Sequence, residues 1–318
     1  MRIAMRRTTT APATPRTHRP GFRRGVPRML VLATCAILFS SCSRDPNVMY
    51  TTAVFDGERA LADVAAQLAF GERIPGSEAH AATGDWILAE LRRAGWETGV
   101  QEFVYDGVRM RNLIARAGPH ASGGILLGTH YDTRPHADRD GGSPEAPVPG
   151  ANDGASGVAV LLELARVLPT ERLDQPLQLV FFDGEDSGRI DGWPWAIGSA
   201  RFVAESRDLP ARAVIVDMAG DADLQLYLEG NSDPYLSGQI WAVAAELEMD
   251  GFIAKPGRNI LDDHVSFLQA GIPAIDIIDI DYPYWHTTED TLDKVSAESL
   301  AQVGQTLLGW LEQEALEP

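Results

Sequence analysis

The sequence predicts an α/β protein in which helices pack against an open sheet, and three observations indicate it. The chain has 318 residues, of which 45% are hydrophobic, enough to bury one large core. Short apolar runs, typical of buried strands, alternate with longer segments whose apolar residues recur at helical spacing. The apolar run at residues 177–182 ends in Asp183-Gly184-Glu185-Asp186, and open α/β sheets bind their ligands at the carboxyl ends of strands.

The first 41 residues are expected to be an export signal. Residues 1–28 hold eight arginines and no acidic residue, and residues 29–41 form an apolar run of 13 residues, which is too short to span a bilayer. The Phe-Ser-Ser-Cys segment that ends at Cys42 resembles a bacterial lipobox, so we expect Cys42 to carry a lipid. Phe39 departs from the usual Leu, Val or Ile, which leaves plain secretion or an uncleaved anchor as alternatives.

The expected organisation is a removed signal peptide at residues 1–41, a linker at 42–58 and a single folded domain at 59–318. Such a protein is exported and held at a membrane of the cell envelope by the lipid on Cys42. The other cysteine lies inside the signal, so the mature domain has no thiol to pair and must depend on packing and metal. Without residues 1–28, 19 basic residues face 45 acidic ones, a balance near −26 that argues against nucleic acid as a partner.

The remaining elements follow in chain order from the same patterns. The first half is predicted to contain helices at residues 60–70 and 80–94, a strand pair at 100–105 and 112–117, a buried strand at 123–128 and a helix after residue 157. Beyond the strand at 177–182, the patterns predict a helix at 196–206, strands at 211–216 and 224–229, helices at 235–247 and up to 270, a strand at 272–280 and a closing helix at 296–315.

Polar side chains follow three of these strands directly. His130 and Asp132 lie on the same side of an extended chain, and a carboxylate at that spacing can hold the second ring nitrogen of a metal-bound histidine or orient a neighbouring ligand. A single histidine at a strand end is more often structural. Glu185 and Asp186 follow the next strand, where one can bind a cation while its neighbour moves protons, although a solvated turn is the simpler interpretation. Asp217 follows the third.

Further candidates lie in loops. Asp153 precedes a helix; a helix N-cap explains the aspartate alone, whereas a metal-bridging carboxylate also explains the glycines around it. Only one of Asp262 and Asp263 is needed to cap the following helix, so the other is available for a site. His286 lies in an aromatic loop. The two tryptophans within residues 189–195 can form a pocket wall or fasten the loop to the core.

Six motifs stand in order along the chain: HYD at 130–132, GANDGASG at 150–157, FFDGED at 181–186, VDMAG at 216–220, DDHVSF at 262–267 and YWHTTEDT at 284–291. From about residue 73 to the C-terminus, and including an early RIPGS segment, the chain resembles the M28 family of zinc aminopeptidases, in particular its glutaminyl cyclase branch. The resemblance implies a three-layer sandwich with a central mixed, mostly parallel sheet flanked by helices.

Carried over by position, the resemblance also assigns a zinc site and its surroundings. The implied metal ligands are Asp153, Asp186 and His286. The candidates for a second metal or a supporting role are His130, Asp217 and Asp132. Glu185 matches the general base, and Asp262 and Asp217 would hold the amine or the leaving group. The residues expected to line the substrate pocket are Trp193, Trp285 and Tyr284. Two departures are Asp186, which replaces a glutamate of many members, and Asp276, which replaces a histidine of the animal cyclases.

The implied reaction converts an N-terminal glutamine of a peptide or protein into pyroglutamate and releases ammonia. One zinc ion would polarise the side-chain amide while Glu185 removes a proton from the α-amine. The alternative is an aminopeptidase with two zinc ions, in which Glu185 deprotonates water and N-terminal residues are hydrolysed. A third hypothesis is a lipid-anchored binding protein that kept the fold and lost the reaction; the intact Glu185 argues against it.

Overall fold

The computed structural model describes residues 53–316, which belong to one compact unit. The predicted signal peptide, Cys42 and the linker up to residue 52 lie outside the described residues. Within residues 53–316, no helix combines the length and the apolar character that crossing a bilayer requires.

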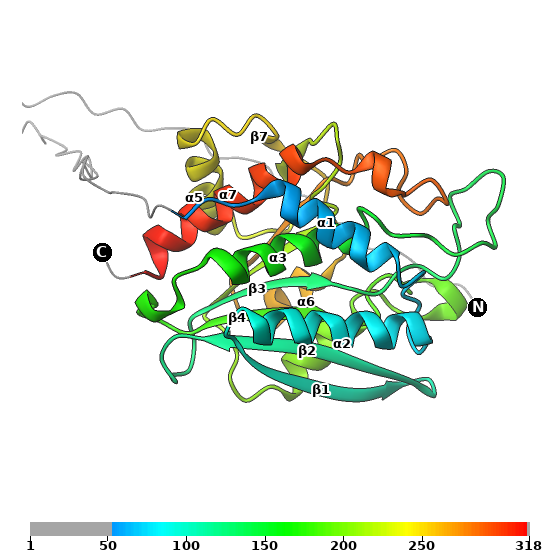
Figure 1. Ribbon diagram of the computed structural model, residues 1–318, viewed down its shortest axis with the longest axis horizontal. Helices are drawn as coiled ribbons and strands as arrows, with labels where there is room; N and C mark the ends of the chain where they lie inside the picture. The colour runs from blue at the N-terminus through cyan, green and yellow to red at the C-terminus, as the bar shows by residue number, and fades with distance from the viewer. Residues whose placement is uncertain (1–52, 317–318) are drawn as a thin grey trace, which may run out of the picture. The chain divides into compact units, whose positions relative to one another are not determined.

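A six-stranded sheet forms the centre of the fold, with the strand order β1-β2-β4-β3-β5-β8 (Figure 1). Its strands are β1 (Glu97–Tyr105), β2 (Val108–Ala117), β3 (Ile125–His130), β4 (Leu177–Phe182), β5 (Arg212–Asp217) and β8 (Ala274–Ile278). Strands β4, β3, β5 and β8 run parallel, and β2 is antiparallel to both of its neighbours. The expected mixed, mostly parallel sheet is therefore confirmed.

Helices cover both faces of this sheet and complete the expected three-layer sandwich. One face carries α1 (Gly57–Leu68), α2 (Glu78–Arg93), α3 (Ala155–Val167), α5 (Pro234–Glu246) and α7 (Ala297–Glu314), whose apolar residues share one core. The other face carries α4 (Ile197–Glu205) and α6 (Asp263–Gln269), which pack on a second core. In Figure 1, α1, α3 and α7 lie above β3 on the first face.

Strand β4 shows why the central strands have apolar sequences. Leu179 and Phe181 belong to the core shared with α3 and α7, while Val180 and Phe182 belong to the core shared with α4 and α6. Because side chains alternate along a strand, one that is covered on both faces must be apolar at almost every position. All six residues of β4 are buried accordingly.

The fold begins before residue 59, the domain boundary expected from the sequence. Phe55 is only 4% exposed, and Asp56 caps α1 by accepting the N–H of Arg59 at 3.0 Å. A Cβ atom on Gly304 of α7 would lie 2.1 Å from the Phe55 ring, so the ring packs directly on the helix backbone. Because this contact joins the two ends of the domain, no local pattern reveals it.

Gly304→Ala should therefore destabilise the protein. The added methyl group overlaps the Phe55 ring, and overpacking of a core typically costs about 1–3 kcal/mol. Gly238 in α5 is exposed, with nothing within 4 Å of its Cβ position, so Gly238→Ala should instead stabilise by about 0.5–1 kcal/mol through helix propensity. Urea denaturation of both variants measures the difference, and equal free energies of unfolding would contradict the Phe55 contact.

A separate two-stranded sheet pairs β6 (Leu226–Leu228) with β7 (Phe252–Pro256) in parallel. The sequence patterns do not predict β7, and they predict a longer β6. The residues of β7 are half-buried or exposed, and the strand ends in proline. It therefore has neither the alternation nor the apolar run from which a strand is recognised.

Candidate active site

Loops at the carboxyl ends of the parallel strands bring the candidate residues together. His130 is the last residue of β3, Asp217 is the last residue of β5, and Asp186 follows β4. Asp153 lies shortly before α3, and His286 comes from the loop after β8. This is the sheet edge at which parallel strands present their ligands.

Asp153, Asp186 and His286 form a buried group whose ligand atoms lie within 4.8 Å of one another. Nε2 of His286 lies 3.2 Å from Oδ1 of Asp186 and 3.8 Å from Oδ2 of Asp153. Within the described residues, both side-chain oxygens of Asp186 and Oδ2 of Asp153 are buried without a hydrogen-bond partner. Buried polar atoms are normally paired, so these atoms fit a cation. Two carboxylates and an imidazole suit zinc with an open position.

A second buried group shares Asp153. Nε2 of His130 lies 3.1 Å from Oδ1 of Asp153 and 3.1 Å from Oδ1 of Asp217, and these three side chains also offer ligand atoms within 4.8 Å of one another. Oδ1 of Asp153 thus faces His130 and Oδ2 faces His286, which is the arrangement required of a carboxylate that bridges two cations. The N-cap of α3 is Gly154, so capping does not explain Asp153.

Asp132 contacts the turn at residues 183–186 and belongs to neither of these two groups of ligand atoms. Its carboxylate accepts the backbone N–H of Glu185 at 3.2 Å and that of Asp186 at 3.1 Å. Its Oδ1 also lies 3.6 Å from Nδ1 of His130. Asp132 therefore orients both the turn after β4 and the histidine at the end of the neighbouring strand β3.

Asp138 supports His286 in a comparable way and was not predicted. Nδ1 of His286 lies 3.2 Å from Oδ1 of Asp138. Arg134 holds that carboxylate with two hydrogen bonds of 2.8 Å, and it donates a third to the carbonyl of Asp186 at 3.0 Å. These residues lie in a loop whose sequence has no regular pattern, so only the fold reveals the contact.

Arg73 is fully buried and joins two of the loops that carry the site. Its guanidinium donates to the carbonyl oxygens of Tyr131 at 3.2 Å, Pro149 at 2.9 Å and Gly150 at 2.5 Å. Burial lowers the pKa of Arg73 to about 10, so the group stays charged at neutral pH. These bonds tie the loop before Asp153 to the end of β3.

Arg73→Met should destabilise the protein by about 3 kcal/mol and reduce its activity. The substitution leaves three carbonyl oxygens without their donor, two of them in fully buried hydrogen bonds, and an unsatisfied buried group costs about 1–3 kcal/mol. Arg201→Met is the control, because Arg201 pairs with Glu205 on the surface of α4 and such pairs contribute about 0–1 kcal/mol. Thermal unfolding of both variants provides the measurement, and similar melting temperatures would contradict the structural role of Arg73.

Burial raises the pKa of most carboxyl groups in the site. The pKa of Glu185 lies well above its ordinary range and that of Asp186 is about 6, with burial as the main cause and neighbouring carboxylates as the second. Burial also raises the pKa of Asp217 to about 8, although His130 opposes the shift. In Asp153 burial acts to raise the pKa, but the hydrogen bond with His130 and the positive charges of His130, His286 and Arg134 together outweigh it, and the pKa falls. A bound cation would be favourable here, because it would offset the mutual repulsion of these groups.

A cavity of about 340 Å³ opens onto these residues. The acidic and histidine residues that line it are Asp153, Glu185, Asp186, Asp217, Asp262 and His286. Glu185 is only 5% exposed and belongs to neither group of candidate ligands. Its carboxylate therefore remains available to move protons.

Two residues expected in the pocket do not line this cavity. The ring of Trp193 lies 5.1 Å from that of Tyr105, and its Nε1 donates to Asp106 at 3.4 Å, so Trp193 fastens its loop to the β1–β2 hairpin. Tyr284 packs against Tyr282, with ring centroids 5.5 Å apart. Both aromatic rings serve loop packing instead of the pocket.

Trp195 forms the wall that was expected from Trp193. Its ring lies 6.0 Å from that of His286 in a stacked arrangement, and it lines the cavity together with Trp285. A Cβ atom on Gly188 would lie 2.0 Å from the Trp195 ring, so only glycine leaves room for the indole. Of the two tryptophans in this loop, one forms a wall and the other fastens the loop.

A third buried group consists of Asp262, His264 and Asp276, whose ligand atoms also lie within 4.8 Å of one another. Nε2 of His264 lies 3.2 Å from Oε2 of Glu229, and its Nδ1 lies 3.6 Å from Oδ2 of Asp276. Asp262 both caps α6, by accepting the N–H of Asp263, and lines the cavity. Asp262 thus both caps α6 and lines the cavity, whereas the sequence predicted that Asp262 and Asp263 would take one of these roles each. Asp276 belongs to the same buried group but does not line the cavity.

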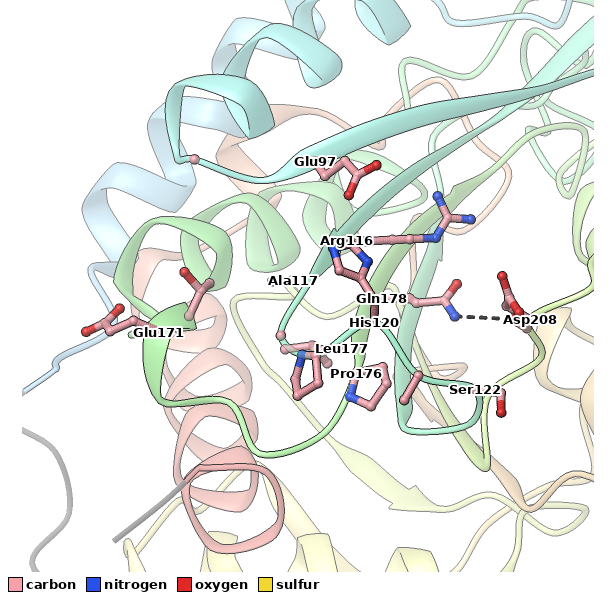
Figure 2. Close-up of a pocket in the computed structure, with 15 residues that line it drawn as sticks. Glu97, Arg116, Ala117, His120, Ser122, Glu171, Pro176, Leu177, Gln178 and Asp208 are labelled. Carbon is pink, nitrogen blue, oxygen red and sulfur yellow. Dashed lines mark hydrogen bonds between the residues drawn. The ribbon is translucent and has the colours of Figure 1, made fainter.

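A larger hollow of about 610 Å³ lies at the opposite end of β4 (Figure 2). Arg116, His120, Gln178 and Asp208 line it, and Gln178 donates to the carbonyl of Asp208 at 3.2 Å. Among the described residues, none of the three candidate ligand groups lies there. We therefore place the functional site at the carboxyl ends of the strands.

Comparison with known proteins identifies the family. Residues 112–311 match peptidase family M28. The chain belongs to this family. The M28 protein is 27% identical over 271 residues to the glutaminyl-peptide cyclotransferase of Drosophila melanogaster, a match that covers 73% of this chain and 75% of the relative.

This M28 protein resembles solved structures that are named as glutaminyl cyclases and others that are named as aminopeptidases. The glutaminyl cyclase of Porphyromonas gingivalis is 35% identical, with a TM-score of 0.78, over 82% of this chain and 99% of that one. A leucine aminopeptidase precursor from Bacteroides thetaiotaomicron is 31% identical, with a TM-score of 0.79, over 84% of this chain and 100% of that one. Because proteins with either name share the fold, the geometry of the site must distinguish the reactions.

Proposed function

We propose that this M28 protein is a zinc-dependent glutaminyl-peptide cyclotransferase, which converts the N-terminal glutamine of peptides into pyroglutamate and releases ammonia. The observation that carries the proposal is the cavity in which Glu185 stands apart from the ligand groups while Trp195 and Trp285 form the walls. Ring closure within the substrate requires a base and benefits from the exclusion of water. The similarity to glutaminyl cyclases over most of the chain supports the same reaction.

The residues that would hold the zinc ion are Asp153, Asp186 and His286. When bound, zinc supplies Lewis acidity at the side-chain carbonyl of the glutamine. Glu185 takes a proton from the α-amine, whose nitrogen forms a bond to the side-chain carbonyl carbon. The bond from that carbon to the amide nitrogen breaks, and Glu185 returns the proton to the leaving nitrogen, which departs as ammonia. Asp262 and Asp217 line the same cavity and would hold the amine or the leaving group by hydrogen bonds.

Aminopeptidase hydrolysis is the second candidate function, and the second ligand group favours it. His130, Asp153 and Asp217 are all present and lie close enough to hold another cation. Glu185 would then take a proton from the attacking water. The similarity to a leucine aminopeptidase precursor supports this alternative.

A paired assay separates the two reactions. The purified, zinc-loaded protein should release ammonia from peptides that begin with glutamine and should release no free amino acid from them. Ammonia is measured with a coupled dehydrogenase, and amino acids are measured by chromatography of the same samples. Release of leucine from leucyl peptides without ammonia from glutaminyl peptides would favour the peptidase, and absence of both products would contradict either function.

A further inference from the structure

The cavity combines two regions of opposite charge. Its buried part is acidic, whereas three exposed arginines, Arg139, Arg189 and Arg258, lie at its opening. They come from the separate loops that follow β3, β4 and β7. We call these three residues the arginine rim. The whole chain carries a formal net charge of −18, so a cationic opening over an acidic cavity is a local feature of this site.

Two residues of the arginine rim have backbones held by hydrogen bonds and guanidinium groups that form no ion pair with a described carboxylate. The guanidinium of Arg139 lies 4.0 Å from the ring centroid of Trp285, and its backbone N–H donates to the carbonyl of His286 at 3.2 Å. Arg189 has a φ of 64° and donates its N–H to the carbonyl of Trp193 at 2.7 Å. Within residues 53–316, neither guanidinium has an ion-pair partner.

The left-handed backbone of Arg189 indicates that the surrounding turn imposes its conformation. A non-glycine residue in the left-handed region is strained, and such strain persists where the surrounding structure imposes it. Arg258 differs from the other two, because it pairs with Asp281 on the surface. Arg139 and Arg189 are therefore the two members of the rim whose charge is available to a ligand.

We infer that the arginine rim selects peptides with an acidic side chain at the second or third position, an inference that rests on the proposed function. The α-amine must reach Glu185 in the acidic part of the cavity, so the residues after the glutamine leave through the opening. There a glutamate is attracted by Arg139 and Arg189, and a lysine is repelled. Exposed ion pairs are individually weak, so the two together should give about a tenfold preference in kcat/KM.

The test compares two peptides that differ in one charge, Gln-Glu-Ala-Ala amide and Gln-Lys-Ala-Ala amide. The wild-type protein should release ammonia from the first with about tenfold higher kcat/KM. The double variant Arg139→Ala/Arg189→Ala should bring the ratio close to one, and Arg139→Glu/Arg189→Glu should invert it. Raising the salt concentration should shrink the wild-type preference.

Arg116→Ala is the control for a distant site, because it removes one arginine charge, half of that removed in the double variant, at the hollow on the opposite end of the sheet. It should leave the preference unchanged. Equal rates for the two peptides in the wild type, or a preference that survives in the double alanine variant, would overturn the inference while the cyclase function stands.

The failure of the proposed function is distinguishable from the failure of this inference. If no glutaminyl peptide releases ammonia, calorimetric binding of the same two peptides to zinc-loaded Glu185→Gln protein still tests the rim. A lower Kd for the glutamate peptide, lost when Arg139 and Arg189 are also replaced by alanine, supports the selection of acidic side chains. Equal Kd values overturn it.

Discussion

Glu185→Gln should lower kcat by about 10²–10⁴-fold while leaving the zinc content unchanged. Glutamine has nearly the shape of glutamate, but its amide does not accept the proton of the α-amine. Because Glu185 lines the cavity and belongs to none of the three ligand groups, metal binding should not depend on it. Ammonia release and elemental analysis of the same preparation measure the two quantities.

Glu205→Gln is the matched control for this variant. Glu205 lies at the end of α4, where it is half exposed and pairs with Arg201, so its replacement should keep full activity. Undiminished turnover in Glu185→Gln would remove this residue from the mechanism. Loss of zinc together with activity would instead place Glu185 among the ligands.

His286→Ala should abolish activity by preventing zinc binding. The imidazole is the only nitrogen donor of the group that it forms with Asp153 and Asp186. Replacement of a residue that merely supports a ligand typically costs about 10–100-fold in metal affinity, so removal of the ligand itself should cost more than about 100-fold. Titration of the apo-protein with zinc, followed by a competing chelator, gives the affinity.

His130→Ala is the informative partner of that variant, because His130 belongs to the second ligand group. In the proposed cyclase the wild-type protein binds one zinc per chain, and His130→Ala keeps it. Two zinc ions in the wild type and one in His130→Ala would favour the peptidase. Full zinc binding by His286→Ala would contradict the assignment of the first group.

The central elements could be predicted because each carries a local signal. The strand predicted at residues 177–182 agrees with β4, whose two covered faces require a continuous apolar run. The helix predicted at 235–247 corresponds to α5, which begins with proline after the capping Asp233. The gathering of His130, Asp186 and Asp217 followed from topology, since parallel strands end at the same edge of the sheet.

Contacts that depend on the folded loops could not be predicted in this way. Trp193 and Trp195 lie two residues apart, and which of them faces the cavity depends on a turn with left-handed Arg189 and Asp191. The contact of Asp138 with His286 likewise joins two irregular segments. Local patterns carry no information about such pairs, because neither partner belongs to a regular element.

The two backbone hydrogen bonds accepted by Asp132 give Glu185, the proposed proton acceptor, and Asp186, a proposed zinc ligand, a common anchor. A displacement of that anchor would misplace both at once. Such an arrangement would allow divergence of the chemistry on a constant framework, in keeping with relatives that bear the names of a cyclase and of a peptidase.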